Sequence, residues 1–429
     1  MDASGSMAND RAQVLKKLDE LLAKLGGKEV RMTVLAFDEK PRVACALTSN
    51  MDQVKAAISA VGEGKGEENC MLAVREAVKL VALPGAYRAI VLLTDEKGND
   101  EDGLEKTIGA VKQAQGHVFL LGRETPFGWC HGYELDTKLG FSVTVDAGPE
   151  SAAIETLQKS PICCQQPWYA WCRKMLTEPT KLSQESFFQR HNPLLCDLAY
   201  DEEVLSGFAP WAMARLCAET GGQTWLIRGR GGYDPKALRG YEPDLCPPAE
   251  YAKRNASDAV RRAVVGVLSE IEEGKDWKLE NCKLSHGQAD RLGKRANELA
   301  VQCRKWIDRL KAAKPNTPSQ GEGLPKRWIA HRDLLVGQLL ALLHWLEQYR
   351  LALSECEYPK GGDVGLCHDK KVRGAGEGRM EALRALEQVQ KDHPGTPWAE
   401  TAKLIASRLH GFSLTIVRYG SGSAQQGDK

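Results

Sequence analysis

Three oxygen-bearing side chains stand at alternate positions near the start of the chain. Asp2, Ser4 and Ser6 form the pattern Asp-x-Ser-x-Ser. On a tight loop, this spacing turns one carboxylate and two hydroxyls toward a common point. Hard divalent cations such as Mg²⁺ take oxygen ligands in proteins and keep some of their water. The pattern therefore predicts a cation-binding loop, but it is short, so its value depends on the elements that follow it.

Hydrophobic periodicity predicts alternating helices and strands after this loop. We expect helices at 11–25, 52–61, 70–83 and 101–115, and strands at 30–37, 42–47, 88–93 and 117–121. Such alternation predicts a doubly wound, mostly parallel α/β sheet with helices on both faces. Ligands of these sheets bind at the carboxyl ends of the strands. Asp95 directly follows the strand at 88–93, and Asp2 would lie at a similar end if a strand preceded it.

This order of elements resembles a von Willebrand factor A domain, which has a Rossmann-like fold. The motifs Asp-Ala-Ser-Gly-Ser-Met at 2–7 and Leu-Thr-Asp-Glu at 93–96 carry the resemblance. In that family, the first loop, a threonine of a second loop and an aspartate after a later strand hold one divalent cation, in a metal-ion-dependent adhesion site. The resemblance implies that Asp2, Ser4, Ser6 and Asp95 hold Mg²⁺, with Mn²⁺ or Ca²⁺ as alternatives, and that Asp95 acts through water.

The second loop departs from the family pattern. Residues 62–69 contain no threonine, and counting back from the helix places Glu68 at the threonine position, with Glu67 as the other possibility. A carboxylate can ligate a metal directly or through water. It would also add negative charge, and so leave less net positive charge for an acidic group of a partner.

The family has an apolar strand directly before the first loop, whereas here only Met1 stands there. We therefore expect the first strand to be truncated. A missing segment of this kind is also where an export signal or membrane anchor could lie.

The resemblance extends to residue 228. A helix pattern, the pair Gly221-Gly222 and a short apolar run resemble the last helix and strand of such a domain. We predict a domain at 1–228 with an insertion at about 123–206. The insertion is either a lid or partner surface or a satellite core packed on the sheet. Its large aromatic residues are Trp129, Trp168, Tyr169, Trp171, Phe187 and Phe188.

Helical patterns dominate the second half of the chain. Residues 229–250 are rich in glycine and proline and are predicted to be a linker, followed by an all-α region at 251–410 and a tail at 411–429. The helix pair at 379–410 resembles a tetratricopeptide hairpin. A single such hairpin is not stable alone, so we expect it to dock on the preceding helices and to serve in interaction or scaffolding.

Composition limits the partners and the compartment. The 429 residues carry a net charge of +1, so charge gives no argument for nucleic acid. No apolar run reaches the roughly 18–20 residues that cross a bilayer, so membrane association is expected only if an N-terminal anchor is missing. The 13 cysteines form no Cys-x-x-Cys pair. This usage favours reduced thiols and the cytoplasm, with disulfides in an exported protein as the alternative.

The sequence favours binding over catalysis. No His-Glu-x-x-His or Gly-x-Ser-x-Gly motif is present, and the glycines at 62, 64 and 66 lack the lysine of a phosphate-binding loop. We expect a divalent-cation-dependent interaction or scaffold protein that binds an acidic side chain of a protein partner. The alternatives are a subunit of a larger ATPase or chaperone-type complex and, because carboxylates crowd the site, a metal-dependent hydrolase.

Overall fold

The structure, a computed structural model, describes most of two compact units of the chain, the first built mainly from residues before Lys253 and the second from residues after it. The described residues are 1–3, 15, 16, 20, 29–62, 64, 68–81, 83, 85–94, 98–124, 127, 151–154, 180–183, 204–226, 233–273, 286–315, 326–355, 363–369, 372–374, 376–407, 409 and 411–417.

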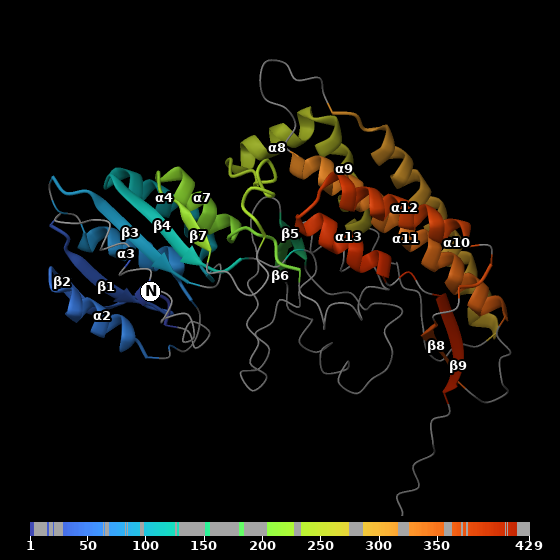
Figure 1. Cartoon of the computed structure of the whole chain (residues 1–429), viewed down its shortest axis with the longest axis horizontal. Helices are drawn as coiled ribbons and strands as arrows, with labels where there is room; N and C mark the ends of the chain where they lie inside the picture. Colours follow the sequence, from blue (N-terminus) through green and yellow to red (C-terminus); the bar gives the residue numbers. More distant parts are fainter. Residues whose placement is uncertain are drawn as a thin grey trace, which may run out of the picture. The chain divides into compact units, whose positions relative to one another are not determined.

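A parallel sheet forms the centre of the first unit (Figure 1). Its three strands are β3 (Arg88–Leu93), β4 (Gly116–Gly122) and β7 (Thr224–Leu226), in the order β3-β4-β7. β3 and β4 pair in register from Arg88 and Gly116 to Leu93 and Leu121. The apolar run of β3 suits a strand that is covered on both faces.

An antiparallel pair accompanies this sheet. β1 (Met32–Ala36) pairs with β2 (Arg42–Thr48). Residues 1–3 connect the pair to the parallel sheet, because Asp2 forms a parallel bridge with Phe37 and its amide donates a hydrogen bond to the carbonyl of Leu93.

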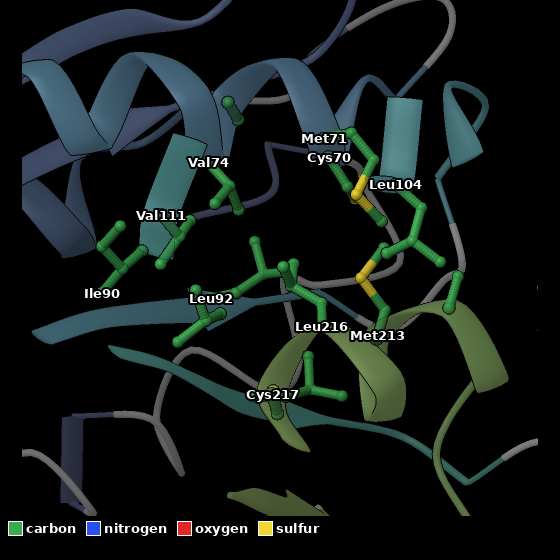
Figure 2. Packing of buried hydrophobic residues seen from close by; sticks show 14 of the residues in the cluster. Cys70, Met71, Val74, Ile90, Leu92, Leu104, Val111, Met213, Leu216 and Cys217 are labelled. Atoms are coloured by element: carbon green, nitrogen blue, oxygen red, sulfur yellow. The ribbon is translucent and has the colours of Figure 1, made fainter. Parts of the chain in front are cut away.

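Helices cover both faces of the sheet. On one face lie α3 (Cys70–Leu80), α4 (Leu104–Gln113) and α7 (Trp211–Glu219), and α4 follows the 3-10 turn η2 (Glu101–Gly103). Their side chains pack against Ile90, Leu92, Val118 and Leu120, and Figure 2 shows part of this core. On the other face, α2 (Met51–Ser59) packs through Val54 and Ile58 with Leu93 and Leu121. The predicted doubly wound α/β fold is confirmed.

The predicted insertion and linker lie partly within the described residues. β5 (Ser151–Ile154) and β6 (Thr180–Ser183) form an antiparallel pair inside the insertion. The six aromatic residues predicted to mark it lie outside the described residues. Residues 233–247, inside the predicted linker, pack on the first unit: Leu238 is buried, and the indole of Trp211 donates a hydrogen bond to the carbonyl of Asp244 at 2.9 Å. The domain boundaries themselves stay a prediction.

The second unit is largely helical, as predicted. Its helices are α9 (Ala259–Glu273), α10 (His286–Ala312), α11 (Lys326–Glu355), α12 (Glu377–Asp392) and α13 (Pro397–Ser407). α11 packs against each of the other four, which explains why it is buried on most of its circumference. Within the described residues, no helix is long and apolar enough to span a bilayer.

The structure differs from the sequence prediction at two places in the second half. The helical pattern at 249–273 is two helices, α8 (Pro248–Ser257) and α9, because the carboxylate of Asp258 accepts the amide of Arg261 at 2.8 Å and caps a new helix. In addition, β8 (Asp363–Asp369) and β9 (Gly411–Val417) form an antiparallel pair in segments for which we predicted no strand.

Candidate metal centre

The first residues of the chain lie between the carboxyl ends of β1 and β3. The amide of Asp2 donates to the carbonyl of Leu93 at 2.8 Å, and the amide of Ala3 donates to the carbonyl of Phe37 at 2.9 Å. The amide of Phe37 in turn donates to the carbonyl of Met1 at 3.0 Å. These bonds place Asp2 at the carboxyl edge, where doubly wound folds bind ligands.

The Asp2 carboxylate is fully buried and has a hydroxyl donor. Thr94, the residue after β3, is 2% exposed, and its Oγ1 donates to Oδ2 of Asp2 at 2.8 Å. The thiol of Cys70, at the start of α3, faces the same hydroxyl oxygen, with Sγ and Oγ1 3.9 Å apart. The three side chains form a buried chain from α3 through β3 to the first loop.

The second loop closes over the first. The amide of Gly64 donates to the carbonyl of Ala3 at 2.7 Å. A Cβ at Gly64 would lie 3.0 Å from the Cβ and Oδ2 of Asp38 and 3.2 Å from the Cβ of Ala3. Glycine therefore permits this close approach of the second loop to residues 3 and 38.

The loop after β3 is hydrogen-bonded to the second loop at Glu68. The amide of Glu68 donates to Oδ1 of Asn99, and the amide of Asn99 donates to the carbonyl of Glu68, both at 2.7 Å. Gly98 adopts a φ of +76°, and a Cβ there would lie 2.9 Å from Sγ of Cys70 and 3.1 Å from the carbonyl oxygen of Glu68. Only glycine fits this position without displacing its neighbours.

The same loop caps α3. The side chain of Asn69, the N-cap residue, makes no capping hydrogen bond. Instead, Asp100 accepts the amide of Met71 at 2.8 Å and that of Leu72 at 2.6 Å. A carboxylate at this end of a helix satisfies its first amides and interacts favourably with the helix dipole.

Electrostatics shows that the carboxylates gather around Cys70. Burial raises the pKa of the Cys70 thiol well above its usual value, and the nearby charges of Asp2, Glu68 and Asp100 raise it further. A raised pKa disfavours the thiolate, the form of cysteine that ligates metals. The pKa of Asp38 is lowered. Partial burial raises this pKa, but the hydrogen bond and the charge of Arg42, together with backbone hydrogen bonds, lower it by more.

Two of the five predicted ligands lie within the described residues. Asp2 and Glu68 come from the two predicted loops and lie around the same buried Cys70. Ser4, Ser6, Asp95 and the alternative Glu67 lie outside the described residues. Among the residues that the structure describes, no group of three histidine, cysteine, aspartate or glutamate side chains is arranged to hold a metal. The complete ligand set therefore stays a prediction.

Thr94 and Asn99 are two residues that the sequence analysis did not identify. Thr94 immediately precedes the predicted ligand Asp95, and Asn99 follows it by four residues. Their partners, Asp2 and Glu68, are 92 and 31 positions away along the chain. The one sequence signal was their closeness to Asp95.

The donors that the structure brings together suit a hard divalent cation. Asp2 and Glu68 supply carboxylate oxygens, the ligand type that Mg²⁺, Mn²⁺ and Ca²⁺ take. The glycine at position 64 also lets the two loops approach closely. The two predicted ligands that the structure describes therefore have the donor chemistry that a hard divalent cation requires.

Comparison with known protein families gives one match. Residues 1–98 match the family model "von Willebrand factor type A domain". The match ends before β4 and β7, which complete the sheet. No curated protein matches the chain.

Several solved structures resemble this chain weakly. A serine-substituted form of an aerotolerance-related membrane protein from Bacteroides fragilis is 15% identical, with a TM-score of 0.28, over 53% of this chain and 89% of that one. The hypothetical protein BatB from Bacteroides thetaiotaomicron is 13% identical, with a TM-score of 0.30, over 60% and 96%. Proximal thread matrix protein 1 from the mussel byssus is 18% identical, with a TM-score of 0.26, over 29% and 36%. These low scores add no argument, whereas the observed fold and the family match together identify a von Willebrand factor type A domain at residues 1–98.

Proposed function

We propose that the first unit is a divalent-cation-dependent protein interaction module. Asp2, Ser4, Ser6, Glu68 and Asp95 hold one Mg²⁺, Mn²⁺ or Ca²⁺ ion at the carboxyl edge of the sheet. A protein partner supplies an acidic side chain to the ion, and the surrounding loops select the partner. The ion provides strong local charge, which gives such contacts specificity.

One observation carries this proposal: the buried carboxylate of Asp2 lies where three loops meet. Burying a carboxylate is costly unless charge or hydrogen bonds compensate it. Thr94 donates one such hydrogen bond, and a divalent cation would add the opposite charge. The neighbouring Glu68 is held by two hydrogen bonds of its backbone to Asn99. The edge thus combines fixed polar groups with the apolar cluster that contains Met1, Ala3 and Leu93.

Glu68 also affects the kind of binding that we propose. A carboxylate at the position of the family threonine adds a negative charge, which favours retention of the cation and weakens its attraction for an acidic partner. We therefore propose a site that keeps its cation firmly and binds its partner with moderate strength. The α12–α13 hairpin is proposed as a second interaction surface in a scaffold.

We propose binding rather than catalysis. A role as the von Willebrand A subunit of a larger ATPase or chaperone-type complex uses the same site and differs only in the partner. Turnover of phosphoester or peptide substrates that is lost in Asp95→Ala would contradict the binding proposal and favour a metal-dependent hydrolase.

Calorimetric titration of Mg²⁺ and Mn²⁺ into the full chain tests the site. Asp2→Asn keeps an oxygen that accepts from Thr94 but removes the charge, so we expect cation binding at least about tenfold weaker. The matched control is Asp52→Asn, in the first turn of α2 and outside the three loops. Equal affinities for the wild type and Asp2→Asn would contradict the metal assignment.

Capture experiments test the partner. Proteins retained by the immobilised full chain should be released by EDTA and should be absent when the chain carries Asp2→Asn. Retention of the same proteins by the variant, or in EDTA, would show that the interaction does not run through the cation.

A further inference from the structure

We propose that the loop after β3 positions the candidate ligands of two other loops: Thr94 holds Asp2, and Asn99 holds Glu68. Both act as positioning residues on either side of Asp95. The inference rests on the proposed function, because it concerns how the cation site is organised. It adds an assignment for two side chains that are not in the predicted ligand set.

Thr94 determines the orientation of the Asp2 carboxylate. A threonine hydroxyl has a single hydrogen to donate, and Thr94 directs it to Oδ2 of Asp2 at 2.8 Å. The thiol of Cys70 faces the same Oγ1, on the acceptor side. Asp2, Thr94 and Cys70 are 0%, 2% and 0% exposed, so bulk water does not compete for these bonds. The hydrogen bond from Thr94 therefore holds the Asp2 carboxylate in one orientation.

Asn99 determines the position of the Glu68 backbone. It makes one hydrogen bond through its side chain and one through its main chain to the same residue, each 2.7 Å long. Gly98 packs without a gap against Cys70 and the Glu68 carbonyl. Asp100 binds the first amides of α3, so the loop and the start of α3 are fixed to each other.

This arrangement prepares the site before a cation arrives. Side chains that orient ligands without touching the metal typically change metal affinity by about ten- to a hundredfold when they are removed. The two residues use different bonds, one to a side chain and one to a backbone. Each can therefore be removed while the proposed ligands remain.

Variants at Thr94 test the first contact. Thr94→Val keeps the shape and loses the hydroxyl, whereas Thr94→Ser keeps the hydroxyl. In titrations of Mn²⁺ into the full chain, we expect binding about ten- to a hundredfold weaker for Thr94→Val and within about threefold of the wild type for Thr94→Ser.

Thr107→Val is the matched control. Thr107 is also buried, at 0% exposure, and its hydroxyl contacts Gly103 and Arg75 in the same unit. This variant should lower the midpoint of thermal unfolding without weakening Mn²⁺ binding. A purely structural role for Thr94 predicts that Thr94→Val and Thr107→Val behave alike.

Variants at Asn99 test the contact between Asn99 and Glu68. They also test the positioning role of the loop after β3 if Thr94→Val does not fold. Asn99→Ala should weaken Mn²⁺ binding about tenfold, whereas Asn99→Asp, which keeps the acceptor, should weaken it less. Asn50→Ala is the control, because the Asn50 side chain, like that of Asn99, accepts backbone amide hydrogen bonds, here two at the start of α2 and away from the three loops.

The outcomes separate this inference from the proposed function. Saturable Mn²⁺ binding that is equal in the wild type, Thr94→Val and Asn99→Ala would overturn the positioning roles alone. No saturable binding by the folded wild type would overturn the cation site and the positioning roles together. Selective weakening with recovery in Thr94→Ser would support both.

Discussion

The two units of this protein bury polar side chains in different settings. In the first unit, Asp2 and Thr94 lie in loops at the edge of a sheet and are joined by a hydrogen bond. In the second unit, a cluster of buried polar and aromatic groups lies on helices. The indole of Trp398 on α13 donates to Nδ1 of His331 on α11 at 3.2 Å, and the guanidinium of Arg327 lies over the Trp398 ring at 5.3 Å.

The chemistry of the surrounding groups distinguishes the candidate cation site from the polar cluster in the helical unit. In the helical cluster, aromatic rings surround the polar groups: His331 meets the rings of Trp328 and Trp398 edge-on at 5.6 and 5.2 Å. Such packing holds α13 on α11, since cation–π and edge-on contacts stabilise a core. At the sheet edge, the groups are acidic and hydroxyl oxygens on three loops. Burial of polar groups alone thus does not mark a binding site, and the donor chemistry must be considered with it.

The largest expected effect is the loss of the indole in the helical cluster. Trp398 is fully buried, so Trp398→Ala should lower the free energy of unfolding of the second unit by about 3–5 kcal/mol. Urea denaturation followed by far-ultraviolet circular dichroism measures this change. Mn²⁺ affinity should remain unchanged in the folded variant. A tenfold weaker affinity would contradict the separation of the two regions.

A smaller loss of folding stability is expected at the sheet edge, where the backbone conformation of single glycines is tested. Gly98 and Gly85 both have positive φ, at +76° and +73°. An added Cβ at Gly85 meets nothing within 4 Å, whereas at Gly98 it meets Cys70 and Glu68. Each alanine variant should lose about 1–2 kcal/mol of stability from the backbone conformation.

Only Gly98→Ala should lose more stability and also weaken Mn²⁺ binding, because its Cβ displaces the loop that holds Glu68. Thermal unfolding and calorimetric titration of the two variants measure the difference. Identical behaviour of Gly98→Ala and Gly85→Ala would show that the close contact has no role.

The smallest effects concern two surface ion pairs, one in each unit. The hydrogen bond from Lys112 lowers the pKa of Glu219 in the first unit. In the second unit, partial burial raises the pKa of Glu270, but hydrogen bonds from Arg309 and Trp306, together with the charge of Arg309, lower it by more, so that this pKa is also below its usual value. A lowered folded pKa stabilises the protein above the unfolded value of about 4.3, and this contribution is lost as pH falls through the folded pKa.

Each exposed pair should contribute less than about 1 kcal/mol. Glu270→Gln should cost more than Glu219→Gln at neutral pH, since Glu270 has two donors, and both costs should shrink near pH 3. Urea denaturation at the two pH values measures these changes. A cost that grows on acidification would contradict the direction of the pKa shifts.

The local sequence was sufficient to predict the α/β fold, whereas the ligand set, which the family resemblance implied, stays a prediction. Alternating apolar runs predicted β1, β3 and β4 nearly at their observed bounds, because hydrophobic periodicity reports local structure directly. The position of Asp95 after an apolar strand and the short loop at 2–6 predicted a cation site at the carboxyl edge of the sheet, and Asp95, Ser4 and Ser6 lie outside the described residues. Glu68 was placed by counting back from a predicted helix, and the structure puts it at the same edge as Asp2.

Only the tertiary structure decided which side chains hold these residues. The bonds from Thr94 to Asp2 and from Asn99 to Glu68 join residues far apart in the chain. The pairing of β8 with β9 likewise joins segments on either side of two helices. Periodicity carries no information about such contacts, since they depend on how whole elements pack. The residue types and their order therefore determined the fold class and the predicted ligands, whereas packing alone determined how the Asp2 carboxylate is oriented and where the Glu68 backbone lies.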